Sequence, residues 1–121
     1  MRQAIVKLTL ALLFLAVFSC SEDQKEKDLI GEWTLVEWKD VTNDRLKQGE
    51  VSFVFKEDKR YTASLNGNAE KGRYWVEFQN LHTVEDGKSE KKVKILKLEN
   101  DTLILEMNRM GTIEKMVLVK E

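Results

Sequence analysis

The sequence predicts an all-β fold, a small eight-stranded antiparallel up-and-down β-barrel, over residues 29–121. From Leu29 onward the apolar residues recur with a period of two, which is the pattern of strands that bury one face. The joints between the apolar runs are short and contain turn dipeptides, which indicates sequential antiparallel pairing. The chain contains no proline, so no strand has to give up a ladder donor.

Eight apolar runs follow one another, with no covering helix expected among them. The runs are residues 31–38, 50–56, 60–66, 73–78, 81–84, 91–98, 102–107 and 112–120. Asn66-Gly67 and Asp86-Gly87 are strong hairpin signals, because both central positions of a type I′ turn need positive φ. Only residues 40–50 form a longer connection. An open sheet would leave two unpaired edges, and closure into a barrel removes both.

The expected interior consists of large side chains. The inward set is Trp33, Leu35, Phe53, Phe55, Tyr61, Leu65, Tyr74, Val76, Phe78, Val93, Ile95, Leu103, Leu105, Val117 and Val119. An eight-stranded barrel is just wide enough either to be filled by such side chains or to hold one small ligand. For a ligand, the candidate contacts are Phe53, Phe55, Tyr61 and Tyr74. The two tyrosines are expected to supply the polar contacts to the ligand, since a buried phenol needs a hydrogen-bond partner.

The first and last strands are apolar on both faces. One set of side chains fills the interior, which leaves Val36, Trp38, Met116 and Leu118 as a candidate exterior patch. Contiguous exposed apolar area often marks a contact surface. We expect this patch either to dock a partner protein, a second copy or the membrane, or to be covered by residues 21–30 or 40–50.

The run VKILKL, residues 93–98, changes face in the middle, with Val93 and Ile95 on one face and two leucines on the other. A β-bulge near Ile95-Leu96 would keep both pairs inward and bend the strand. Five lysines lie between positions 88 and 97. They form either a solvated face or a site for an acidic glycan or lipid head group.

The N-terminal residues have the composition of a secretory signal. Arg2 and Lys7 give a basic start, and residues 8–18 form an apolar core. As a helix this core would reach only ~16 Å, about half of the ~30 Å hydrocarbon thickness. That length predicts a signal peptide, residues 1–19, cut between Ser19 and Cys20.

The sequence VFSC, residues 17–20, resembles the lipobox of bacterial lipoproteins, in which the cysteine thiol is acylated and becomes the new N-terminus. The resemblance implies lipidation of Cys20 with fatty acyl chains such as palmitate, and an outer-membrane lipoprotein of the bacterial cell envelope. The tract Ser21-Glu22-Asp23 resembles a surface-export signal of such lipoproteins, or is part of a solvated, flexible tether over residues 20–28. A free or intermolecularly paired thiol at Cys20 is the alternative.

The sequence LIGEWTLVEW resembles the G-x-W opening of lipocalin-like barrels, with Gly31 and Trp33 in the motif positions. The strand order that follows is similar to that of small bacterial lipocalin-like lipoproteins, over nearly all of residues 29–121. The resemblance implies that Trp33 plugs the closed end of the barrel under a cationic side chain of the final strand. Lys120 is the nearest candidate for that side chain.

Composition and residue types exclude several function classes. Without residues 1–19, 102 residues remain (121 − 19), with 18 basic and 21 acidic residues and a net charge of −3. A nucleic-acid binder would show a strong basic excess. His82 and Cys20 are single residues of their kind, and no clustered metal ligands or nucleophile and phosphate-loop motifs stand out. We therefore expect no enzyme, metal or cofactor.

Two functional hypotheses remain. The first is a lipid-anchored binding module that holds a small apolar or amphipathic ligand in the barrel. The alternative is a filled barrel that serves as an interaction or accessory subunit of an envelope protein complex. An open cavity of roughly 300 Å³ or more favours the first, because ligand pockets start at about that volume.

Overall fold

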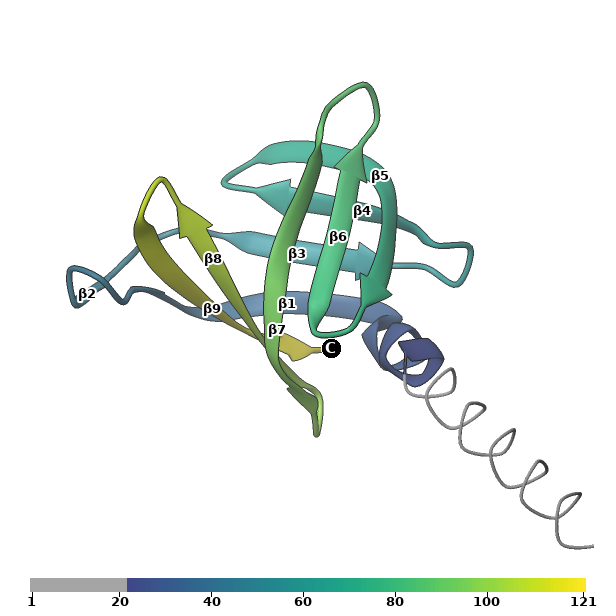
Figure 1. Ribbon diagram of the computed structural model, residues 1–121, viewed down its shortest axis with the longest axis horizontal. Helices are drawn as coiled ribbons and strands as arrows, with labels where there is room; N and C mark the ends of the chain where they lie inside the picture. Colours follow the sequence, from purple (N-terminus) through teal and green to yellow (C-terminus); the bar gives the residue numbers. More distant parts are fainter. Residues whose placement is uncertain (1–21) are drawn as a thin grey trace, which may run out of the picture.

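The computed structural model describes residues 22–121, which form one short helix and nine strands (Figure 1). Residues 22–29 are helical. The strands are β1 (Gly31–Asp40), β2 (Arg45–Leu46), β3 (Val51–Phe55), β4 (Arg60–Leu65), β5 (Asn68–Glu77), β6 (Asn80–Glu85), β7 (Glu90–Glu99), β8 (Thr102–Arg109) and β9 (Thr112–Lys120). The signal peptide, the cleavage site at Ser19 and Cys20, the lipidation of Cys20, and Ser21 lie outside the described residues. Within the described residues, no helix has the length and apolar character needed to cross a bilayer.

The eight long strands close into an up-and-down barrel, as the alternation predicts. The order in the sheet is β2-β1-β3-β4-β5-β6-β7-β8-β9, and β1 pairs in addition with β9. All neighbours are antiparallel, and the closing seam runs from Trp33 opposite Lys120 to Asp40 opposite Glu114. The two-residue β2 pairs only with the end of β1. It lies within the connection of residues 40–50, so the expected count of eight barrel strands is confirmed.

A β-bulge at Val36 decides which side chains of β1 face inward. The register of β1 against β9 shifts around this residue, so Val36 points outward with 59% of its surface exposed, whereas Trp38 is only 8% exposed. Met116 lies opposite Trp38 on β9 and is buried, as is Leu118. The predicted exterior patch is therefore wrong in three of its four members. One extra residue reverses the alternation that follows it.

The other inward predictions are confirmed except for three residues. Phe78 lies in the turn between β5 and β6, with a φ of 56°, and is 70% exposed. Val117 and Val119 alternate with buried residues of β9 and therefore point outward. The confirmed members are buried or pack against the core: Trp33, Leu35, Phe53, Phe55, Tyr61, Leu65, Tyr74, Val76, Val93, Ile95, Leu103 and Leu105.

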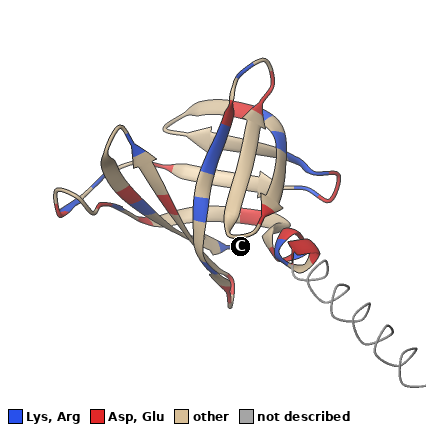
Figure 2. Cartoon of the chain, in the orientation of Figure 1, with Lys and Arg blue, Asp and Glu red and all other residues tan. Residues whose placement is uncertain are grey.

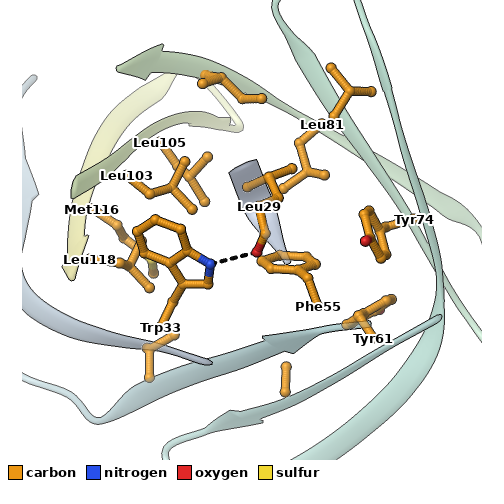
Figure 3. Packing of buried hydrophobic residues seen from close by; sticks show 14 of the residues in the cluster. Leu29, Trp33, Phe55, Tyr61, Tyr74, Leu81, Leu103, Leu105, Met116 and Leu118 are labelled. Carbon is orange, nitrogen blue, oxygen red and sulfur yellow. Dashed lines mark hydrogen bonds between the residues drawn. The ribbon is translucent and has the colours of Figure 1, made fainter. Parts of the chain in front are cut away.

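The helix over residues 22–29 covers one end of the barrel (Figure 1). Leu29 is fully buried, and its carbonyl accepts a 2.7 Å hydrogen bond from Trp33 Nε1 (Figure 3). Lys120 Nζ lies 5.3 Å from the centroid of the Trp33 ring and donates to the Asp28 carbonyl at 3.1 Å. The cationic cover over Trp33 is therefore the expected Lys120. Gly31 leaves room for it, since a Cβ there would lie 2.8 Å from Lys120 Cε.

The expectation of a flexible tether is wrong for residues 22–28. Glu26 accepts a 3.0 Å hydrogen bond from the backbone N–H of Val76 and forms a 3.2 Å ion pair with Lys59. Lys25 Nζ donates to the backbone carbonyl of Phe78 at 2.9 Å. The polar composition of this segment predicts a chain surrounded by solvent. The contacts that hold it come instead from groups at strand ends and turns that are distant in the sequence.

The bulge expected in β7 is confirmed. The register between β7 and β8 shifts between Ile95 and Lys97, which makes Leu96 the extra residue. Leu98 packs against the core as expected, whereas Leu96 points outward and is 44% exposed. The bulge thus keeps one leucine inside rather than two.

Candidate functional site

The end of the barrel opposite the helix contains a cavity of about 600 Å³. This open end carries the connection of residues 40–50 and the turns β4–β5, β6–β7 and β8–β9. The residues that line the cavity are Trp38, Val51, Phe53, Tyr61, Leu65, Asn66, Asn68, Glu70, Leu81, Thr83, Lys91, Lys92, Val93, Leu105, Met107, Asn108, Arg109 and Met116. Its volume lies within the usual range of about 300–1,000 Å³ for small-molecule sites.

The walls of the cavity are mainly apolar and come from all eight long strands of the barrel. Phe53 and Leu65 belong to the hairpin of β3 and β4, whereas Leu105 and Met116 belong to β8 and β9. Polar lining residues gather at the strand ends and turns of the open end, for example Asn66. This arrangement suits a molecule with an apolar body and allows it a polar group at the mouth.

Two of the four predicted ligand contacts line the cavity, namely Phe53 and Tyr61. The other two, Phe55 and Tyr74, lie in the packed core, where their rings meet edge to face with centroids 4.9 Å apart (Figure 3). The Tyr74 hydroxyl donates to the Lys56 carbonyl at 2.7 Å, and burial raises the pKa of Tyr74 to about 12. Alternation correctly places all four residues inside, but it does not say at which height along the barrel.

Tyr61 and Glu70 form a polar pair inside the cavity. The Tyr61 hydroxyl donates a 2.7 Å hydrogen bond to Glu70 Oε2. Burial raises the pKa of Tyr61, and the hydrogen bond and charge of Glu70 raise it further. Tyr61 therefore stays neutral and remains a donor, while Glu70 is the one carboxylate among the lining residues.

A buried carboxylate fixes Trp38 at the mouth, and the sequence analysis did not find it. Trp38 Nε1 donates to Glu114 Oε1 at 2.7 Å, and Lys47 Nζ lies 3.1 Å from the same oxygen and 4.4 Å from the centroid of the Trp38 ring. Burial acts to raise the pKa of Glu114, but hydrogen bonds from Lys47 and Trp38, with the charges of Lys47 and Arg109, lower it overall. The sequence does contain a sign of this position, because Glu114 lies two residues before Met116 and therefore on the same face of the strand.

A second hollow lies at the closed end, beside the helix. It has a volume of about 610 Å³ and is lined by Asp23, Glu26, Lys27, Ile30, Glu57, Lys59 and Tyr74. Most of these residues are charged, and Glu26 and Lys59 pair with each other. This hollow is also more open to solvent than the first cavity, and it is therefore the weaker candidate for a small-molecule site.

His82 lies on the outer wall of the barrel, away from both hollows. Its ring stacks on Trp75 with centroids 5.0 Å apart, and its Nδ1 lies 3.2 Å from a carboxylate oxygen of Glu90. Across residues 22–121, no three His, Cys, Asp or Glu side chains are grouped so that they could hold a metal ion.

A closed antiparallel barrel with one covered end and one open cavity is the architecture of small ligand-binding β-barrels. Residues 29–105 match the family described as a lipocalin-like domain. This match spans more than half of the chain, and the chain belongs to that family.

Two solved structures share the fold. A lipocalin-like protein from Bacteroides uniformis is 16% identical, with a TM-score of 0.62 over 78% of this chain and 99% of that chain. An uncharacterized protein from Bacteroides eggerthii is 13% identical, with a TM-score of 0.62 over 77% of this chain and 99% of that chain. No curated protein matches this sequence.

Proposed function

We propose that this protein is a binding module that holds one small apolar or amphipathic molecule in the cavity at its open end. The cavity of about 600 Å³ with apolar walls supports the proposal most directly, because side chains fill a barrel of this size when it binds nothing. The accessory-subunit alternative depended on an exposed patch around Trp38, and Trp38, Met116 and Leu118 are buried. No other observation favours that alternative.

We propose further that Cys20 carries a lipid anchor and that the protein resides in the outer membrane of a bacterial envelope, with Ser21-Glu22-Asp23 as a surface-export signal. The sequence VFSC and the apolar segment before it support the anchor. The helix of residues 22–29 lies at the closed end. An anchor two residues earlier therefore leaves the mouth of the cavity directed away from the point of attachment.

Metabolic labelling with an alkyne-tagged fatty acid tests the anchor. The protein made in a bacterial host should incorporate the label, and a Cys20→Ser variant should not. An unlabelled wild-type chain, or equal labelling of the variant, contradicts the anchor and leaves the binding proposal intact.

A matched pair of valine substitutions tests the binding proposal. The neutral apolar probe N-phenyl-1-naphthylamine should bind the purified chain, with a rise in probe fluorescence. Val93→Trp introduces a large ring where Val93 lines the cavity and should weaken binding at least tenfold. Val36→Trp introduces the same ring on the outer wall and should leave the affinity unchanged. Absence of binding to the wild type, or an equal loss in both variants, would contradict a site in the cavity.

A further inference from the structure

The pairing of β7 with β8 ends before the two strands reach the open end of the barrel, and we call the unpaired stretch between them the side opening. These strands pair from Lys94 opposite Glu106 to Glu99 opposite Thr102. The first residues of β7, 90–93, pair with β6, and the last residues of β8, 107–109, pair with β9. Figure 1 shows β7 and β8 diverging toward the open end.

The bulge at Leu96 lies next to the point where the two strands separate. A β-bulge bends its strand and increases the local twist, which gives a physical reason for the divergence. Residues on both sides of the opening line the cavity, with Val93 on β7 and Met107 on β8. The side opening is therefore continuous with the apolar interior.

Three cations flank this opening. Lys91 and Lys92 belong to β7 and Arg109 belongs to β8, and all three line the cavity. Lys91 alternates with Val93 and buried Ile95, and Arg109 alternates with Met107 and buried Leu105. Both therefore occupy inward positions at the strand ends. Figure 2 shows the band of basic residues along β7.

The carboxylates near these cations are engaged by other groups. Glu90 lies against His82, and Glu85 pairs with Lys88 at 2.9 Å. Within residues 22–121, neither Lys91 nor Lys92 has a carboxylate oxygen within 4.0 Å. Their charge is therefore left for another partner.

Arg109 shares its carboxylate, since it lies 3.7 Å from Glu114 Oε1, the oxygen that Lys47 also contacts at 3.1 Å. The residues that line the cavity include three cations, Lys91, Lys92 and Arg109, and one carboxylate, Glu70. The lining therefore has a surplus of two positive charges (3 − 1), although the whole chain has a net charge of −1.

We propose that the ligand is an anionic amphiphile, whose apolar tail fills the cavity and whose ionised head lies between Lys91 and Arg109 at the side opening. This inference rests on the proposed function and names its ligand class. Glu70 supports the orientation, because it lies on β5 rather than beside the opening and accepts the Tyr61 hydroxyl. The head thus meets cations while the tail passes the aromatic and aliphatic walls.

Three probes with the same tail and different heads test the inference. Dodecanoate, dodecanol and dodecylammonium are titrated into the purified chain, below their aggregation concentrations, with displacement of N-phenyl-1-naphthylamine as the readout. Dodecanoate should bind at least tenfold more tightly than dodecanol, and dodecylammonium should bind most weakly. The advantage of dodecanoate should shrink with added salt, because the cations are partly solvated and salt screens them.

A charge-removing pair of variants assigns the effect to the side opening. Lys91→Gln/Arg109→Gln should lower the affinity for dodecanoate about tenfold, to that for dodecanol, and leave dodecanol binding unchanged. The control is Lys94→Gln/Lys97→Gln, which removes the same charge from β7 residues that do not line the cavity.

The outcomes separate the two proposals. Equal affinities for dodecanoate and dodecanol, or tightest binding of dodecylammonium, would overturn the anionic class and leave the binding proposal standing. An equal loss in both double variants would overturn the assignment to Lys91 and Arg109. If N-phenyl-1-naphthylamine binds and none of the three dodecyl probes displaces it, the ligand class is wrong and the binding proposal stands. If N-phenyl-1-naphthylamine itself does not bind, the proposed function is wrong.

Discussion

The two ends of this barrel are built from the same eight strands and yet differ in how completely side chains fill them. At the closed end Leu29, Trp33 and Phe55 are at most 1% exposed, and a helix and Lys120 cover them. At the open end the cavity occupies the interior between Phe53 and the rim. The same small barrel is therefore filled by side chains at one end of its axis and hollow at the other.

The difference comes from what each end adds to the strands. The closed end gains the helix of residues 22–29 and rings that pack edge to face, such as Phe55 and Tyr74. At the open end β7 separates from β8, and polar residues lie at the turns. Stability should reside at the closed end and binding at the open end, and the following substitutions test that division.

The largest loss of stability is expected for Trp33→Ala. Removing a fully buried tryptophan should cost about 3–5 kcal/mol of unfolding free energy, and the hydrogen bond to the Leu29 carbonyl is lost as well. Urea denaturation followed by circular dichroism measures it. Val36→Ala on the outer wall is the control and should stay within about 0.5 kcal/mol. A loss below about 1 kcal/mol for Trp33→Ala would show that the closed end is not the stable part.

A second large loss is expected when the helix is detached from the barrel. Leu29→Ala should cost about 2–5 kcal/mol, as for other fully buried leucines, because Leu29 is fully buried. Leu46→Ala in the connection at the mouth removes the same atoms from a side chain that is 72% exposed, and it should have little effect. Equal denaturation midpoints for the two variants would mean that the helix adds nothing to the core.

A smaller, pH-dependent effect is expected at the mouth for Glu114→Gln. The pKa of Glu114 is lowered from 4.5 in the folded chain, so its ionised form stabilises the fold above that pH, and this contribution is lost as the pH falls through the lowered value. The variant should be about 1–2 kcal/mol less stable than the wild type at pH 7, because two charge-assisted contacts are weakened.

Denaturation at pH 7 and at pH 3 measures the effect of Glu114→Gln, and the gap between variant and wild type should narrow at the lower pH. Glu37→Gln is the control, because Glu37 is exposed on β1. A gap that is the same at both values would show that the charge of Glu114 does not stabilise the mouth.

Much of the barrel was predictable because its signals are local. Alternation gave the strands and most of the inward residues, and a change of face within residues 93–98 predicted the bulge of β7. The bulge at Val36 was not predictable in the same way. Residues 33–38 are apolar on both faces, so either face could point inward and the pattern does not show that an extra residue interrupts it.

The helix and the cavity depend on contacts that no local pattern contains. Residues 22–29 are mostly charged, and the contacts that hold them come from Val76, Phe78 and Lys59. The cavity is the volume that side chains leave between strands distant in sequence, so Phe53 and Phe55 look alike in the sequence and yet have different roles. Lys120 over Trp33 was expected from the family resemblance, which carries non-local information.

The seam between β1 and β9 ties the beginning of the barrel to its last residue. Thr34 Oγ1 donates to a carboxylate oxygen of Glu121, 87 positions away. Chain segments so far apart meet late and slowly, because loop-closure entropy opposes them until both are available. During synthesis one edge of β1 therefore stays unpaired until β9 has left the ribosome. A chain that lacks β9 should aggregate through this unpaired edge rather than close into a smaller barrel.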